Sequence, residues 1–149
     1  MKKPELLAPA GNLEKVNIAL AYGADAVYVG CRFFGLRKYS ENLSLLDLEK
    51  AVNSANKLGK KIYLTLNSFP HNQDLEELTK YLPSLNKIKP HAFIVSDLGV
   101  LKLIQENSEI PVHISTQASV LNSDSVNFWQ NQGAKRIILA REVSIKEIK

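Results

Sequence analysis

Seven polar side chains that could contact a substrate follow short apolar runs of this chain. They are Arg37, Asn67, His71, Asp97, Gln117, Arg141 and Glu142. Asn67 offers both a donor and an acceptor to an amide or a base edge, and His71 can exchange a proton near neutral pH. The guanidinium groups of Arg37 and Arg141 match phosphate and carboxylate groups. We expect these seven residues to bind a substrate, and the sequence assigns no catalytic residue and no metal ligand.

Several of these candidates also have a structural interpretation. Asn67 and His71 can order a loop and cap the helix after it. Asp97 or its neighbour Ser96 stands where a helix begins, and an N-cap is the simpler role there. Gln117 ends an apolar run and fits either substrate binding or a hydrogen-bond network in the core.

Two further positions have alternatives of the same kind. Arg141 and Glu142 can pair with each other, but alternation along a strand turns one of them towards the substrate side. His113 lies deeper in its apolar run, which favours a core histidine whose hydrogen bonds are satisfied.

The six apolar runs that precede these polar residues predict six β-strands. They cover residues 6–9, 26–30, 62–67, 92–97, 112–117 and 137–141. Apolar strands that alternate with helical segments indicate βαβ units on a parallel sheet, whose ligands gather at the carboxyl ends of the strands. Tyr63, Thr65 and Asn67 share one face of the third run, opposite Leu64 and Leu66. One aliphatic face and one partly polar face favour a barrel over an open, doubly wound sheet.

Length is the argument against a complete barrel. An eight-stranded (β/α) barrel takes about 250 residues, whereas this chain has 149 residues and strands for six. A five-stranded flavodoxin-like sheet fits that length, but the loop after the first run has no glycine-rich phosphate cradle. The prediction is therefore an α/β fold, a parallel (β/α) TIM-type barrel that is incomplete, with residues 1–149 forming the amino-terminal part of one barrel domain.

Five helices are predicted between the strands. We expect caps at Asn12, at Ser44, near Asp97 or Leu98, and at Asn122 or Ser123, and a third helix from Gln73 to Leu82 that Pro83 ends. Ser144 and Glu147 have the spacing of a capping box, which marks a helix start two residues before the last one. We expect a chain cut within a βα unit, with open barrel edges that lead to self-association or need a second chain to complete the barrel.

Composition narrows the class of protein. The net charge is +4, and 45% of the residues are hydrophobic. No apolar stretch approaches the ~20 residues of a membrane span, and no signal peptide is present, so we expect a cytoplasmic protein with no membrane contact.

Cys31 is the single cysteine, which favours a small buried residue. The basic residues that precede strands, Lys61 and Arg136 among them, are interpreted as solvated loop residues.

Hydrolytic motifs are absent from the sequence. There is no G-x-S-x-G and no H-E-x-x-H, and nothing marks Ser115 or Ser119 as an activated nucleophile. The residues by themselves therefore do not indicate peptide hydrolysis.

Seven short motifs in order resemble the amino-terminal half of the collagenase-like peptidase family of unknown catalytic type, family U32. The motifs lie at residues 4–11, 21–30, 35–37, 66–72, 96–99, 115–117 and 139–144. The sequence is most similar to the branch that takes part in hydroxylating carbon 5 of the wobble uridine of bacterial tRNA. The resemblance implies tRNA as a partner, with a collagenase-like peptidase as the alternative.

The resemblance also implies an iron–sulfur cluster for the complete protein, bound by a cysteine-containing segment after the sixth strand. The chain ends before that segment, so we expect no cofactor in these 149 residues and no activity of the chain alone. A third alternative is a non-catalytic fragment or a split-gene subunit that needs a partner chain.

Overall fold

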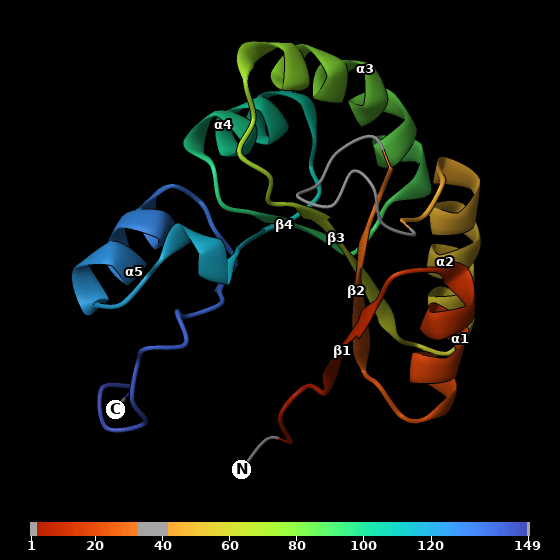
Figure 1. Ribbon diagram of the computed structural model, residues 1–149, viewed down its shortest axis with the longest axis horizontal. Coiled ribbons are helices and arrows are strands. Elements are labelled where there is room, and N and C mark those ends of the chain that lie inside the picture. The colour runs from red at the N-terminus through yellow and green to blue at the C-terminus, as the bar shows by residue number, and fades with distance from the viewer. Residues whose placement is uncertain (1–2, 33–41, 149) are drawn as a thin grey trace.

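The computed structural model describes residues 3–32 and 42–148, in which six strands alternate with five helices (Figure 1). The elements are β1 (Leu7–Ala10), α1 (Leu13–Ala21), β2 (Ala26–Gly30), α2 (Leu45–Lys57), β3 (Lys61–Leu66), α3 (Asn72–Ile88), β4 (Ala92–Val95), α4 (Leu98–Asn107), β5 (Val112–Ile114), the 3-10 turn Thr116–Ala118, α5 (Ser123–Asn131) and β6 (Arg136–Ile137). All neighbouring strands pair in parallel, in the order β1-β2-β3-β4-β5-β6. The predicted incomplete (β/α) barrel is confirmed.

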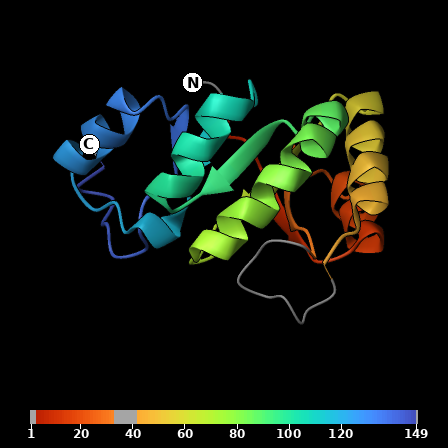
Figure 2. The same cartoon turned by 90° about the horizontal axis from the view of Figure 1, so that it is seen from above.

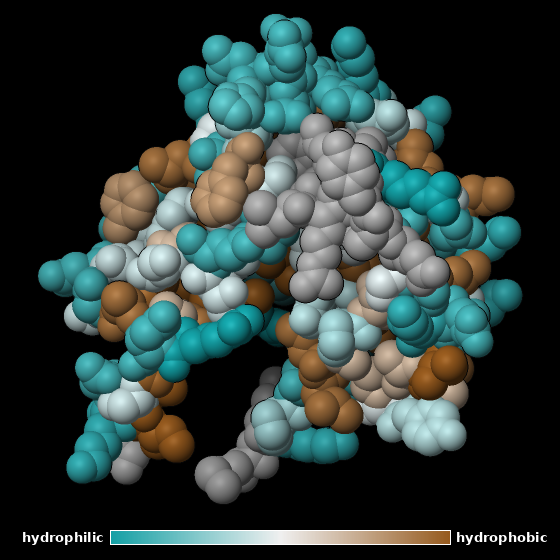
Figure 3. All heavy atoms as spheres, in the orientation of Figure 1, coloured by the Kyte–Doolittle hydropathy of each residue, from teal (hydrophilic) through white to brown (hydrophobic). Residues whose placement is uncertain are grey.

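The sheet curls, and its helices cover the outer side of the curve. Figure 1 shows helices around the arc from α1 to α5 while both termini lie below it, and Figure 2 shows the same arrangement from above. The space-filling view is hollowed on the side where the termini lie (Figure 3). The described part of the chain is thus a curved half-barrel whose inner face is open on one side.

The two faces of the sheet differ as the alternation of residues predicts. Val29, Leu64 and Phe93 point outwards into the large core that the helices close, and each is at most 1% exposed. Tyr63 belongs instead to a small inner cluster with Ala26, Ala92 and Ile94. The apolar core thus lies mainly between the sheet and its helices, and only a small apolar cluster lies on the inner face.

Helix ends follow local signals in the sequence. The side chains of Asn12, Ser44, Asp97 and Asn122 each accept a hydrogen bond from the backbone N–H three residues later. Gly23, Gly59 and Gly133 follow the carboxyl ends of α1, α2 and α5, each with positive φ, a conformation that costs glycine little. The predicted caps at these four helices are confirmed.

The predicted end of the third helix at Pro83 is wrong, because α3 continues from Asn72 to Ile88. Proline removes one backbone hydrogen bond and costs a helix interior about 3 kcal/mol. Pro83 is exposed, and the buried Leu78, Leu82 and Leu85 form one stripe that runs past it. Burial of apolar side chains on both sides of the proline outweighs the lost bond.

The predicted bounds of β1 and β3 are shifted by one residue, and those of three other strands differ by more. β4 ends at Val95 and not at residue 97, β5 ends at Ile114 and not at residue 117, and β6 covers only Arg136–Ile137. Near the end of the chain, the Glu147 carboxylate accepts hydrogen bonds from the Ser144 N–H (2.8 Å) and hydroxyl (2.6 Å). The predicted capping-box contact is therefore present, on a turn.

Candidate functional site

Three polar side chains meet where the neighbouring strands β3, β4 and β5 end. The Asn67 amide donates to the Ser115 hydroxyl (Nδ2–Oγ 3.4 Å), and the Ser96 hydroxyl donates to the Asn67 backbone carbonyl (3.3 Å). Ser115 is 3% exposed, whereas Asn67 and Ser96 are half-buried. We call Asn67, Ser96 and Ser115 the carboxyl rim of the half-barrel, the edge at which barrel proteins bind ligands.

The carboxyl rim is suited to hydrogen bonding. Ser115 holds the 3-10 turn, because its hydroxyl also accepts from the Gln117 N–H (3.3 Å). Within the described part of the chain, Asn67 uses only one of its amide protons in a side-chain hydrogen bond. Its other proton and its side-chain carbonyl can pair with the donor and acceptor of a substrate amide or base edge.

Asp97 and His71 both start helices beside the rim. The Asp97 carboxylate accepts from the Val100 N–H at 2.9 Å, so the N-cap role expected at Ser96 or Asp97 belongs to Asp97. The N–H of His71 donates to the Asp74 carboxylate (2.8 Å) at the start of α3, and the His71 side chain is exposed. Both residues lie at the predicted end of the sheet, in positions that also order the loops.

Gln117, Arg141 and Glu142 lie beyond the strands and are exposed. Gln117 is in the 3-10 turn Thr116–Ala118, so its predicted position on a strand is wrong. Arg141 and Glu142 are in a turn after β6, where strand alternation does not apply, and among the described residues they do not pair with each other. Arg37 lies outside the described residues.

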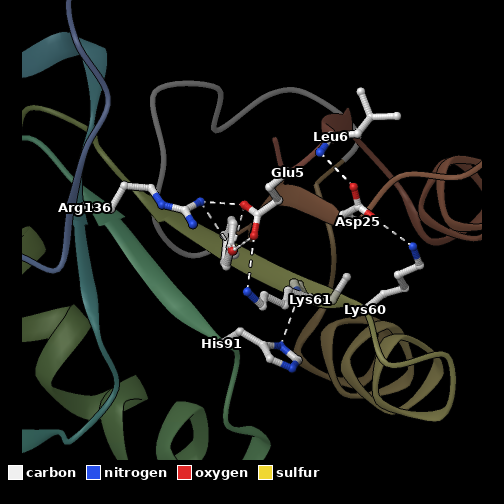
Figure 4. Close-up of polar contacts among 9 residues, drawn as sticks. Glu5, Leu6, Asp25, Lys60, Lys61, His91 and Arg136 are labelled. Atoms are coloured by element: carbon white, nitrogen blue, oxygen red, sulfur yellow. Dashed lines mark hydrogen bonds and ion pairs between the residues drawn. The ribbon is translucent and has the colours of Figure 1, made fainter. Parts of the chain in front are cut away.

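A second polar cluster, at the amino-terminal end of the barrel, was not singled out from the sequence (Figure 4). Glu5 precedes β1, and its carboxylate accepts from the Tyr63 hydroxyl (3.0 Å), from Lys61 (3.2 Å) and from Arg136 of β6 (2.5 Å). The Arg136 guanidinium also lies 5.5 Å from the Tyr63 ring centre. Lys61 and Arg136 are thus solvated as expected, but they begin β3 and β6 instead of lying in loops, and both pair with Glu5.

The electrostatics of this cluster favour fixed charges. The hydrogen bond from Arg136 is the main reason that the pKa of Glu5 is lowered to about 2, although burial opposes it. Burial and the bond to Glu5 raise the pKa of Tyr63 to about 12. Neither group changes its protonation near neutral pH, so the cluster is not suited to proton transfer.

His113 of β5 lies beside the Glu5 cluster on the inner face. Its ring packs edge-on against Tyr63, with ring centres 4.8 Å apart, and the residue is 7% exposed. Burial, reinforced by Arg136, lowers the pKa of His113 to about 4. Its Nδ1 has no hydrogen-bond partner within the described part of the chain. The prediction of a core histidine is right about burial, but the expected hydrogen bond at Nδ1 is not made within the described residues.

A thiolate-bound iron–sulfur cluster does not fit the residues of this chain. Such clusters are generally held by four cysteines, whereas the chain has one, Cys31. Cys31 is fully buried, and burial raises the pKa of its thiol to about 12. Residues 3–32 and 42–148 contain no group of three or more His, Cys, Asp or Glu side chains placed to hold a metal ion, and no helix there is long and apolar enough to cross a membrane.

Comparison with known proteins places this half-barrel in a family. The chain is 44% identical to tRNA hydroxylation protein P1 of Bacillus subtilis over 99% of its length, and 43% identical to tRNA hydroxylation protein P of Escherichia coli over 99%. It covers only 35% and 33% of those two proteins. The solved U32 peptidase Mk0906 has the same fold over 93% of this chain and 61% of its own, with a TM-score of 0.68 at 13% identity. The family model of Peptidase family U32 matches residues 11–149, and the chain belongs to that family.

Proposed function

We propose that this chain forms part of an enzyme that hydroxylates carbon 5 of the wobble uridine in tRNA. The observation that carries the proposal is the 43–44% identity, across 99% of the chain, to tRNA hydroxylation proteins. The carboxyl rim supplies hydrogen-bonding groups at the end of the barrel where substrates bind. A cytoplasmic location follows from this proposal, since tRNA is the substrate.

Asn67 is the residue that we assign to uridine recognition. The uracil edge carries both acceptors and an N–H donor, and a side-chain amide complements that pattern. The bond to Ser115 fixes the direction of the Asn67 amide before the substrate binds, which limits the entropy lost on binding. Asp97, His71, Gln117, Arg141, Glu142 and Arg37 remain candidates for contacts around this base, with the arginines directed to phosphates. The oxidation itself is not assigned to a residue of this chain.

We further propose that additional strands complete the barrel, supplied by a longer chain or by a partner chain. The relatives are about three times as long as this sequence. β6 pairs with β5 along one edge, and beside β6 lies a cavity of about 610 Å3 between α5 and the carboxyl-terminal segment. Its lining includes the apolar Leu121, Ile137 and Ile148. Residues 1–149 are then the amino-terminal part of one barrel domain.

The peptidase alternative lacks support from the site. Acyl-transfer hydrolysis needs a nucleophile within reach of a base. The Ser115 hydroxyl contacts Asn67 and Gln117, and Nδ1 of His113 forms no hydrogen bond in the described ranges. The peptidase alternative is suggested by the name of the family, Peptidase family U32, and not by the arrangement of residues in the site.

The test is genetic and chemical. Deleting the gene is expected to remove 5-hydroxyuridine-type nucleosides from tRNA, measured by mass spectrometry in a strain without a redundant paralogue. Restoring the gene with Asn67→Leu, which removes the amide and keeps the volume, is expected to lower the modification at least tenfold. Asn53→Leu changes an exposed amide on α2 and serves as the control. Unchanged tRNA nucleosides in the deletion strain would contradict the proposed function.

A further inference from the structure

Two large apolar side chains are exposed beside the carboxyl rim. Phe69 lies in the loop between β3 and α3 and is 74% exposed, and Leu98, the first residue of α4, is 53% exposed. Each stands two residues after a member of the hydrogen-bonded pair Asn67 and Ser96. Since single exposed apolar residues are common, the informative feature is that these two flank the polar groups of the rim.

The loop that carries Phe69 is anchored on both sides of the ring. Upstream, the Asn67 carbonyl accepts from Ser96 (3.3 Å), and downstream the His71 N–H donates to Asp74 (2.8 Å). Pro70 follows directly and restricts the backbone of Phe69 to extended conformations. The backbone of Phe69 is therefore held beside the rim by contacts of its neighbours, while its ring is mostly exposed. A ligand that covers it binds to a loop that is already ordered.

An exposed aromatic ring beside a fixed amide has the chemistry of a nucleobase site. A base presents an apolar face that stacks on aromatic side chains and a polar edge that forms hydrogen bonds. Phe69 supplies the stacking surface, and Asn67 supplies the edge contacts. We propose that Phe69 is a stacking platform for an unpaired nucleobase of RNA at the carboxyl rim. This inference rests on the proposed function and adds a residue and a binding mode to it.

Binding of RNA to the 149-residue chain tests the inference. The probes are an anticodon stem-loop with uridine at the wobble position and the same RNA with an abasic site there. Phe69→Ala is expected to weaken binding of the uridine RNA by about 5- to 150-fold, the effect of losing one base–aromatic stack. Phe69→Trp keeps the affinity, and uridine quenches the fluorescence of the new indole. Phe69→Leu, apolar without a ring face, behaves like Phe69→Ala.

The controls separate stacking from other effects. Phe128→Ala removes a 48% exposed ring on α5 and leaves RNA binding unchanged. The abasic RNA binds the wild type and Phe69→Ala equally. A Phe69→Ala protein that loses affinity for both RNAs to the same extent overturns the stacking inference, because Phe69 would then order the loop.

Two results distinguish this inference from the proposed function. If the wild type binds RNA and Phe69→Ala binds it equally well, the stacking platform is wrong while the RNA function stands. Should that variant also change self-association, Phe69 belongs to a protein contact. If the wild type binds neither RNA, the inference and RNA recognition by this chain both fail.

Discussion

At the scale of single residues, His113 ties stability to pH. It lies against Tyr63 on the inner face, and burial, with the nearby charges of Arg136 and Lys61, lowers its pKa to about 4 although Glu5 opposes this. The unfolded chain takes up the proton near pH 6.5 and the folded chain only near pH 4. The free energy of unfolding is therefore expected to fall between pH 6.5 and 4, with a slope of at most about 1.4 kcal/mol per pH unit from this group.

Urea unfolding at a series of pH values measures this slope. Burial also lowers the pKa of His91, so that residue contributes in the same direction. Glu5 stays charged in the folded chain, where its pKa is about 2, but its ordinary pKa is 4.5, so the unfolded chain protonates it at the acid end of the window and Glu5 adds to the slope there. His113→Phe keeps an aromatic ring against Tyr63 and is expected to flatten most of the slope, whereas His71→Gln, at an exposed position, retains it. An unchanged slope in His113→Phe would mean that the imidazole is not the titrating group.

At the scale of elements, the Glu5 cluster joins the two ends of the sheet. Glu5 precedes β1 and Arg136 belongs to β6, so their ion pair links the first and last strands at their amino-terminal ends (Figure 4). Glu5→Gln removes the charge and keeps the shape, and it is expected to lower the free energy of unfolding by about 1.5–3 kcal/mol, as for hydrogen bonds to charged groups. A double-mutant cycle with Arg136→Met measures the coupling free energy between Glu5 and Arg136.

The exposed pair Lys102–Glu106 (3.8 Å) is the matched control, with an expected coupling of about 0.3–0.5 kcal/mol. Equal coupling in the two pairs would show that the Glu5 cluster is an ordinary surface contact.

At the scale of the whole molecule, the edges of the half-barrel favour association. Sheet edges with free backbone groups pair with other strands, and the cavity beside β6 exposes Leu121 (47%) and Ile148 (60%). Sedimentation velocity of the 149-residue chain is expected to show concentration-dependent oligomers. The double variant Leu121→Lys and Ile148→Lys is expected to reduce them, and Ile18→Lys, at a 50% exposed position on α1, leaves them unchanged. A monomer at every concentration would contradict this expectation.

Features that depend on neighbouring residues are predictable from the amino-acid sequence. Alternation in β3 placed Tyr63 and Leu64 on opposite faces, and caps such as Asn12 and Asp97 bond to backbone only three residues away. The parallel barrel followed from these patterns and from the order of strands and helices. The edge of the sheet at which the strands end is therefore predictable, and with it the placement of Asn67 and Asp97 at that edge, although the last residue of each strand is not.

Contacts between segments that are far apart in the sequence depend on the tertiary structure. Glu5 and Arg136 lie 131 residues apart and meet because the sheet curls, which no local pattern encodes. The same holds for α3, where packing of Leu78, Leu82 and Leu85 carries the helix past Pro83. Gln117 and Arg141 lie outside the strands in which they were predicted. The reason is that β5 pairs with β4 over only three residues and with β6 over only two. The length of a strand depends on the neighbouring strand with which it pairs. The sequence of the strand itself therefore does not determine where the strand ends.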